Sequence, residues 1–221
     1  MISSIPVVLQ AAYLSQALPV CAAFLRRGRP LSAPARAVLV WCTLLVLSDA
    51  LGLITAYLLG ENQWVQYLTV PLESGIALWV LSDWQTQEVM RIAYRVTIPI
   101  LIFITAAVSI ALRPAPAFDQ LLAPFHSLVL LAASLYTLVH RTLLAEQAVT
   151  EADWFWITLG MSLTFGTDVA VRPFAEAFIM TRPDWVADAY ITKGWVDILA
   201  FLLITRGILR ASLQPRFGGS S

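Results

Sequence analysis

The sequence predicts an all-α integral membrane protein, built as a bundle of seven transmembrane helices. The chain of 221 residues is 59% hydrophobic and 13% charged, and its mean hydropathy is +0.75. A soluble domain carries about 25% charged residues, and roughly 20 apolar residues span a bilayer. Seven stretches reach about that length and take up most of the chain: 4–25, 37–59, 64–82, 93–112, 120–140, 154–177 and 187–209. We expect a single transmembrane domain over 1–212 and a flexible tail over 213–221.

The arginines between these stretches predict the orientation of the chain in the membrane. Cytoplasmic loops carry an excess of Lys and Arg. The first, third and fifth connections and the C-terminal end hold most of the cations: Arg26, Arg27, Arg29, Arg36, Arg91, Arg95, Arg141, Arg206, Arg210 and Arg216. The second connection holds none, and the fourth and sixth hold Arg113 and Arg182. We therefore expect the N-terminus outside and the C-terminus in the cytoplasm. Compact loops and a preference for Arg over Lys favour the inner membrane of a bacterium.

The rarer features of the chain limit the class of protein further. The first five residues lack the basic region of a signal peptide, so the first stretch is expected to be a helix of the bundle. A net charge of zero gives no reason to expect a nucleic-acid partner. Cys21 and Cys42 lie inside stretches, which favours packing over a disulfide. Membrane hydrolases that bind a metal need about three histidines, whereas this chain has His126 and His140.

The polar residues and prolines inside the first four stretches predict their character. Pro19 is expected to kink the first stretch, because proline lacks an N–H and clashes with the preceding turn. The second stretch carries Asp49 near its middle, and the third carries Glu73 two residues after Pro71. The fourth contains Pro99 but no ionisable group in its central part.

The last three stretches hold further ionisable groups. The fifth carries His126 in its outer half, and a polar loop over 145–153 follows. The segment from Thr150 to Asp153 is typical of a helix start, with acids in the first turn. The sixth and seventh stretches carry four charged residues that matter here: Asp168, Arg172, Lys193 and Asp197. Lys193 is the only lysine in the chain, and a charge inside a bilayer is a candidate for function because it is costly to place there.

Counting residues from the turns places these groups at similar depths in the membrane. Asp49 and Glu73 each lie about twelve residues from the turn near Glu61 and Asn62, so both carboxyls are expected roughly 18 Å below it. Arg172 and Lys193 lie about ten and eleven residues from the sixth connection, with Asp168 and Asp197 about four residues deeper. His126 belongs to the same outer half. Lipid cannot solvate these groups, so we expect them to face inward and meet one another, with no such group from the first and fourth stretches.

The charged layer has two interpretations. Asp168 and Arg172, and Lys193 and Asp197, are spaced i,i+4, so each cation can pair on its own helix and the charges can simply join helices. Asp49 and Glu73 have no cation on their own helices. Two such acids facing two cations suit a ligand pocket, a counter-ion set or a proton relay.

The eight tryptophans fall into two groups by their expected depth in the membrane. Six lie near predicted span ends, as in the aromatic belts of membrane proteins: Trp41, Trp64, Trp84, Trp154, Trp156 and Trp185. Trp79 and Trp195 lie deeper, and we expect these two to line a cavity.

Seven helices with a membrane lysine on the last one, together with Thr69-Val-Pro71-Leu72 on the third, resemble the microbial rhodopsins. The resemblance implies that Lys193 attaches retinal and that Glu73 or Asp49 is its counter-ion. Val65 stands where that family has its usual counter-ion.

A second pattern on the third stretch, Asn62-x-Trp64 followed by Tyr67 and Pro71-x-Glu73, resembles an uncharacterised bacterial family of seven-helix membrane proteins. This resemblance supports the fold and implies no activity.

Three hypotheses for function follow. The first is a non-enzymatic membrane protein whose outer-half cavity binds a small apolar or polar-tipped ligand, with retinal or another polyene as the candidate cofactor. The second is a structural or accessory subunit of a larger membrane complex. The third is a proton-coupled carrier that uses Asp49 and Glu73. The expected partners are the lipid bilayer and either other membrane subunits or further copies of the chain.

Overall fold

A computed structural model describes residues 6–26, 30–60, 63–111, 122–145 and 148–211. This part of the chain consists of helices joined by turns and loops, with no strand, and confirms the all-α class. Its elements are α1 (Val7–Ser15), α2 (Leu18–Leu25), α3 (Ala33–Leu59), α4 (Gln63–Asp83), α5 (Glu88–Ala111), α6 (Ala123–Leu143), the 3-10 turn η3 (Val149–Glu151), α7 (Asp153–Phe178) and α8 (Pro183–Arg210). The expected tail over 213–221, the turn at Glu61 and Asn62, and loop cations Arg27, Arg29, Arg113 and Arg216 lie outside the described residues.

Each of the seven apolar stretches corresponds to one helix, except the first, which is divided. α1 and α2 meet at a bend of 43°. Pro19 lies in the first turn of α2, where proline is tolerated, and its ring excludes a straight continuation from α1. The predicted kink is confirmed. The predicted helix start at Thr150 is displaced, since Thr150 lies in the 3-10 turn η3 and α7 begins at Asp153.

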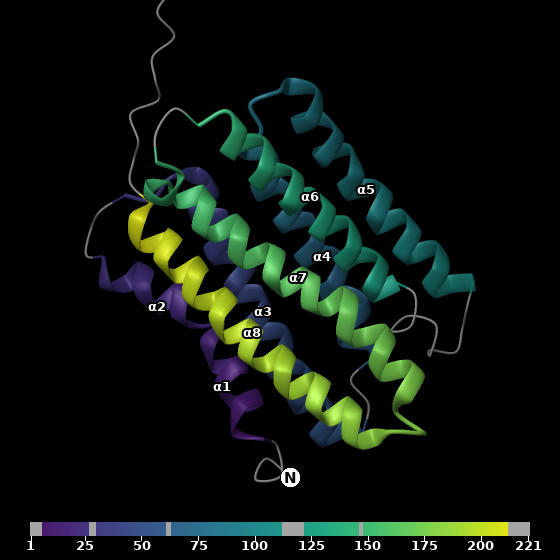
Figure 1. The fold of residues 1–221 in the computed structure, drawn as a ribbon. Coiled ribbons are helices and arrows are strands. Elements are labelled where there is room, and N and C mark those ends of the chain that lie inside the picture. The colour runs from purple at the N-terminus through teal and green to yellow at the C-terminus, as the bar shows by residue number, and fades with distance from the viewer. Residues whose placement is uncertain (1–5, 27–29, 61–62, 112–121, 146–147, 212–221) are drawn as a thin grey trace, which may run out of the picture.

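The helices form a closed ring with one helix at its edge (Figure 1). α8 packs along α7, α7 along α6, α6 on α4, and α4 on α3. α2 closes the ring by contacting both α3 and α8, and α1 also lies against α8. α5 packs on the outer side of α4 and forms the edge of the bundle in Figure 1. Helices far apart in sequence, α1 and α8, are therefore neighbours.

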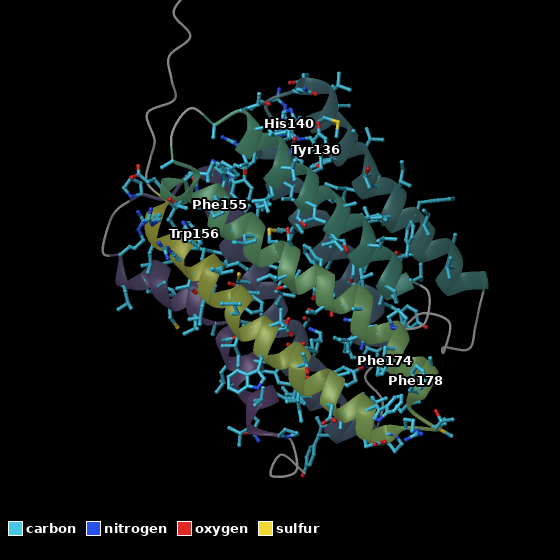
Figure 2. The ribbon with its side chains drawn as sticks, viewed as in Figure 1. Tyr136, His140, Phe155, Trp156, Phe174 and Phe178 are labelled. Atoms are coloured by element: carbon cyan, nitrogen blue, oxygen red, sulfur yellow. The ribbon has the colours of Figure 1, made fainter. Side chains whose placement is uncertain are left out.

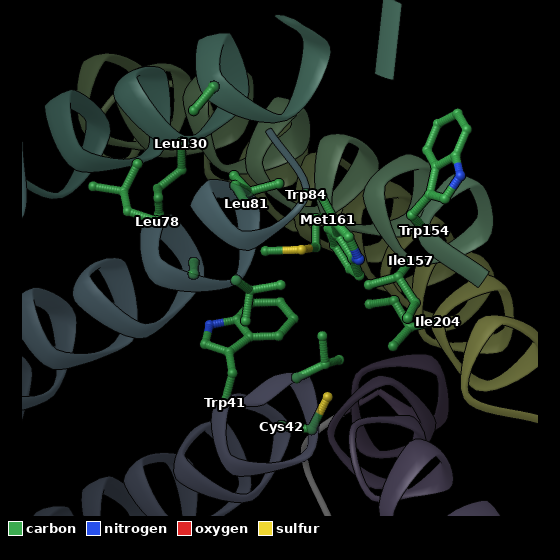
Figure 3. Packing of buried hydrophobic residues seen from close by; sticks show 14 of the residues in the cluster. Trp41, Cys42, Leu78, Leu81, Trp84, Leu130, Trp154, Ile157, Met161 and Ile204 are labelled. Carbon is green, nitrogen blue, oxygen red and sulfur yellow. The ribbon is translucent and has the colours of Figure 1, made fainter. Parts of the chain in front are cut away.

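The apolar core lies between α3, α4, α7 and α8 (Figure 3). Trp41 is 1% exposed, and its ring packs 5.8 Å from Phe165 and 6.4 Å from Phe201, measured between centroids. The assignment of Trp41, Trp84 and Trp154 to an interfacial belt was wrong, because all three indoles are buried in this core. Leu78 and Ile157 complete the same layer and are fully buried.

Two glycines bring α7 and α8 into close contact. A Cβ atom on Gly160 would lie 2.6 Å from the Ala200 carbonyl oxygen, and one on Gly207 would lie 2.9 Å from the Asp153 carbonyl oxygen. A side chain at either position would force the two helices to shift apart. Small residues at helix interfaces allow backbones to approach in this way.

The surface of several helices is apolar. Three helical segments are long and apolar enough to cross a membrane, namely Ala33–Leu59, Glu88–Val108 and Ala123–Leu143, and the bent pair α1 and α2 would make a fourth if it counts as one span. Large apolar side chains such as Ile54 and Phe103 are 54% and 73% exposed. These features indicate association with a membrane.

One end of the bundle is held together by arginines. The Arg26 guanidinium donates to the Ile208 carbonyl at 2.5 Å, and Arg141 donates to the Trp84 carbonyl at 2.9 Å. Both contacts satisfy carbonyl groups at helix C-termini, which lack partners within their own helix.

Aromatic side chains gather at both ends of the bundle (Figure 2). Tyr136 stacks on His140, and Phe155 packs against Trp156, at the end that holds the arginines. Phe174 and Phe178 pack together at the opposite end of α7.

Candidate functional site

A cavity of about 390 Å³ opens between α1, α3, α4, α7 and α8. Its lining includes six of the ionisable residues singled out by the sequence: Asp49, Glu73, Asp168, Arg172, Lys193 and Asp197. The expectation that these side chains meet inside the bundle agrees with this geometry. Their role in binding a ligand stays a prediction.

The α7 and α8 wall of the cavity holds both cations in ion pairs. The Lys193 amine lies 2.5 Å from an Asp197 carboxylate oxygen, one turn along α8, and 3.3 Å from Asp168 on α7. The Arg172 Nε lies 3.5 Å from the same Asp168 oxygen. The i,i+4 spacings place these partners on one helix face, and Lys193 also links the two helices. The cations on α7 and α8 are thus paired with carboxylates on the same two helices.

The α3 and α4 wall is different, because the contacts to its two carboxylates come from neutral donors. The Gln16 amide donates to Asp49 Oδ2 at 2.8 Å, and the Ser48 hydroxyl donates to Glu73 Oε1 at 2.8 Å. Within the described residues, none of the ion pairs shorter than 4 Å includes Asp49 or Glu73. The facing cations are engaged with Asp168 and Asp197 instead.

The sequence reasoning missed the contribution of the first stretch. We expected no ionisable group there, yet α1 brings the Tyr13 phenol to the cavity, and the bend after it brings Gln16, a neutral amide. The signal was present in Gln16, a primary amide close to Pro19 in a stretch with few polar residues. A polar side chain in such surroundings needs a partner inside the protein.

His126 does not belong to this cavity, contrary to the expectation from its depth. Its side chain is 1% exposed and lies between α4, α5 and α6. Nδ1 lies 2.8 Å from the Ser74 hydroxyl, and Nε2 lies 2.8 Å from the Thr105 hydroxyl. His126 was expected beside the charged layer, but α6 turns its side chain toward α5.

Trp79 and Trp195 also lie outside the cavity lining, so the expectation that they line it was wrong. Trp195 is 60% exposed and Trp79 is 48% exposed. Successive helical residues are about 100° apart, so a residue two places after Lys193 points about 200° away from it. The Arg95 guanidinium covers the Trp79 ring at 4.6 Å from its centroid.

Several buried acceptor atoms in the cavity lining have no hydrogen-bond partner in the part of the chain that the structure describes. Gln16 Oε1, Gln66 Oε1 and Asp197 Oδ1 are buried without a hydrogen-bond partner, and all three residues line the cavity. No three His, Cys, Asp or Glu side chains in the described ranges are arranged to hold a metal ion. The arrangement is suited to receive hydrogen-bond donors.

No family model, curated protein or solved structure matches the chain.

Proposed function

We propose that the chain is an integral membrane protein with seven spans, its N-terminus outside and its C-terminus in the cytoplasm, located in a bacterial inner membrane. The three helices that are less apolar, α4, α7 and α8, have 21, 26 and 28 residues. At about 1.5 Å per residue, even the shortest reaches about 30 Å, the thickness of the hydrocarbon core. Their central charges line the cavity, so these helices can cross beside the apolar ones without exposing ions to lipid.

Reporter fusions test this topology. A fluorescent protein fused after Arg210 should be bright, and alkaline phosphatase fused at Arg182 should be active, since one reporter needs the cytoplasm and the other the outside. The reverse result at either position contradicts the orientation.

The function that we propose for the bundle is the binding of a small polar ligand in the outer-half cavity. The observation that carries it is the pair Asp49 and Glu73, two carboxylates inside the bundle whose contacts come from Gln16 and Ser48. Ionisable groups at membrane depth are costly and mark binding sites, ion paths or proton relays. The same pair would serve a proton-coupled carrier, whereas a purely structural subunit would need the α7 and α8 ion pairs alone.

Cysteine labelling tests whether the cavity is open to small molecules. In a background with Cys21 and Cys42 replaced by Ala, Thr69→Cys should react with a small membrane-impermeant thiol reagent added from outside. Ala77→Cys, on the same helix but 0% exposed in the core, should not. Equal protection of both positions would remove the binding hypothesis.

Retinal attachment is a second candidate, because the one lysine of the chain lines the cavity. The groups in contact with its amine are Asp168 and Asp197, so these two, and not Glu73 or Asp49, fit the counter-ion role. A bound polyene would supply visible absorption, and the chain would supply the amine and its counter-ions. The aromatic rings in the lining are those of Tyr13, Tyr190 and Phe201.

Borohydride trapping after incubation with all-trans-retinal tests this candidate. The wild type should retain the label, and Lys193→Arg, which keeps the charge, should not. A folded wild type without a visible band excludes rhodopsin-like chemistry.

A further inference from the structure

We propose that the cavity selects a small organic cation with a primary ammonium group, held by Asp49 and Glu73. The inference rests on the proposed binding function and specifies its ligand class.

Charge balance is the first support. The cavity is lined by four carboxylates, Asp49, Glu73, Asp168 and Asp197, and by two cations, Arg172 and Lys193, so its formal charge is 2 − 4 = −2. Both of these cations are held in ion pairs with Asp168 or Asp197 on the α7 and α8 wall. Uncompensated charge away from water is unfavourable. A positively charged ligand beside α3 and α4 reduces that imbalance, and an anion increases it.

Hydrogen-bond chemistry narrows the type of cation. The Gln16 amide and the Ser48 hydroxyl direct their donors at the two carboxylates, which holds the acids in place. The Oε1 atoms of Gln16 and Gln66 line the same cavity as buried acceptors without a partner. A primary ammonium carries three N–H donors and no acceptor. It can therefore donate hydrogen bonds to carboxylates and amide oxygens at the same time. A quaternary ammonium has no N–H group and cannot donate any.

The size and the apolar lining limit the rest of the ligand. A volume of about 390 Å³ is near the small end of the range of about 300–1,000 Å³ found for ligand pockets. Leu9, Leu53 and Val70 provide apolar surface in the lining. A short alkyl chain attached to the ammonium group fits this combination.

Protons on Asp49 and Glu73 would also neutralise the excess charge, so the test must separate a bound ammonium from protonated carboxyls. Full-length protein in lipid nanodiscs is titrated calorimetrically at neutral pH with four probes of the same chain length: butylammonium, butyltrimethylammonium, 1-butanol and butanoate. Infrared spectra record the carbonyl band of protonated carboxyls before and after each titration.

We expect butylammonium to bind at least about tenfold more tightly than each of the other three probes, a difference of about 1.4 kcal/mol. Asp49→Asn and Glu73→Gln should each weaken butylammonium binding by about tenfold or more, because each removes one charged acceptor. Asp83→Asn is the matched control, since Asp83 lies on α4 but pairs with Arg95, away from the cavity. Its affinity for butylammonium should equal that of the wild type, and thermal melts verify that every variant folds.

Three results would overturn the inference. Equal binding of butanol or butanoate, lost in a cavity variant, would keep the binding function and reject the cation. Unchanged butylammonium binding in Asp49→Asn and Glu73→Gln would reject these residues as its site. No binding of any probe, with a protonated carboxyl band in the wild type that Glu73→Gln removes, would reject both the ammonium ligand and the binding function in favour of proton transfer.

Discussion

Lys193 on α8 lies 3.3 Å from Asp168 on α7, so one amine joins the two helices that form a wall of the cavity. The same amine contacts Asp197 at 2.5 Å. Lys193 is thus the centre of the ion pairs in this wall, and the consequences of removing it can be compared with those of removing Arg172.

Lys193→Leu should destabilise the protein more than Arg172→Leu. The Lys193 side chain is 18% exposed and lies 2.5 Å from Asp197 and 3.3 Å from Asp168, whereas the Arg172 side chain is 32% exposed and lies 3.5 Å from Asp168. Leaving one member of a buried pair behind costs about 3–5 kcal/mol. Detergent melting curves of the two variants measure the order, and an equal or larger loss for Arg172→Leu would contradict it.

The hydrogen bond between Gln16 and Asp49 should couple the bend after α1 to α3. A hydrogen bond to a charged group contributes about 1.5–3 kcal/mol. In a double-mutant cycle, Gln16→Leu and Asp49→Leu should show a coupling free energy of about that size. If the changes in unfolding free energy of the two single variants simply add in the double variant, the contact contributes nothing to stability.

His126 should be neutral with its proton on Nε2. The Thr105 hydroxyl donates to the Leu101 carbonyl at 2.8 Å, so it accepts from His126 Nε2–H. Nδ1 then accepts from the Ser74 hydroxyl.

Nitrogen NMR of a His140→Gln variant, which leaves His126 as the one histidine, reads this tautomer directly. Ser74→Ala should leave Nδ1 without its donor and cost about 1–3 kcal/mol. A proton found on Nδ1 at neutral pH would refute the assignment.

Gly160→Ala should be destabilising, by about 1–3 kcal/mol, because the new methyl group meets the Ala200 carbonyl oxygen at 2.6 Å. Gly166→Ala is the matched control on the same helix, where the nearest atom would be the Leu131 Cδ1 at 3.7 Å. That control should be neutral or stabilising by up to about 1 kcal/mol, since alanine favours helix. Equal changes in the melting temperatures of the two variants would show that the close contact between α7 and α8 does not cause the loss of stability.

The sequence predicted which charged residues come together along the bundle, but it did not predict the direction in which each side chain points around its helix. Counting residues from the turns predicted similar depths for Asp49, Glu73 and Lys193. These three residues line one cavity in the structure. The direction around the helix depends on which neighbours a helix packs against, and that information is spread over the whole chain. Trp195 and His126 were expected in the same group, yet Trp195 faces outward and His126 faces α4 and α5.

The contribution of Gln16 was missed for a related reason. Its importance depends on the break between α1 and α2 and on the packing of α1 against α8. An apolar stretch with few polar residues carries no periodic signal that would identify its inward face. The proline indicated where the chain bends, but not toward which helix.

The glycine contacts between α7 and α8 also limit how the cavity can change shape. Backbones held together at Gly160 and Gly207, and joined further along by Lys193 and Asp168, should behave as one rigid body. Any widening or narrowing around a ligand must then come from displacements of α1, α3 and α4 relative to this fixed pair. Asp49 and Glu73 belong to the movable side, so the carboxylates proposed to hold the ligand are also the groups whose positions can adapt to it.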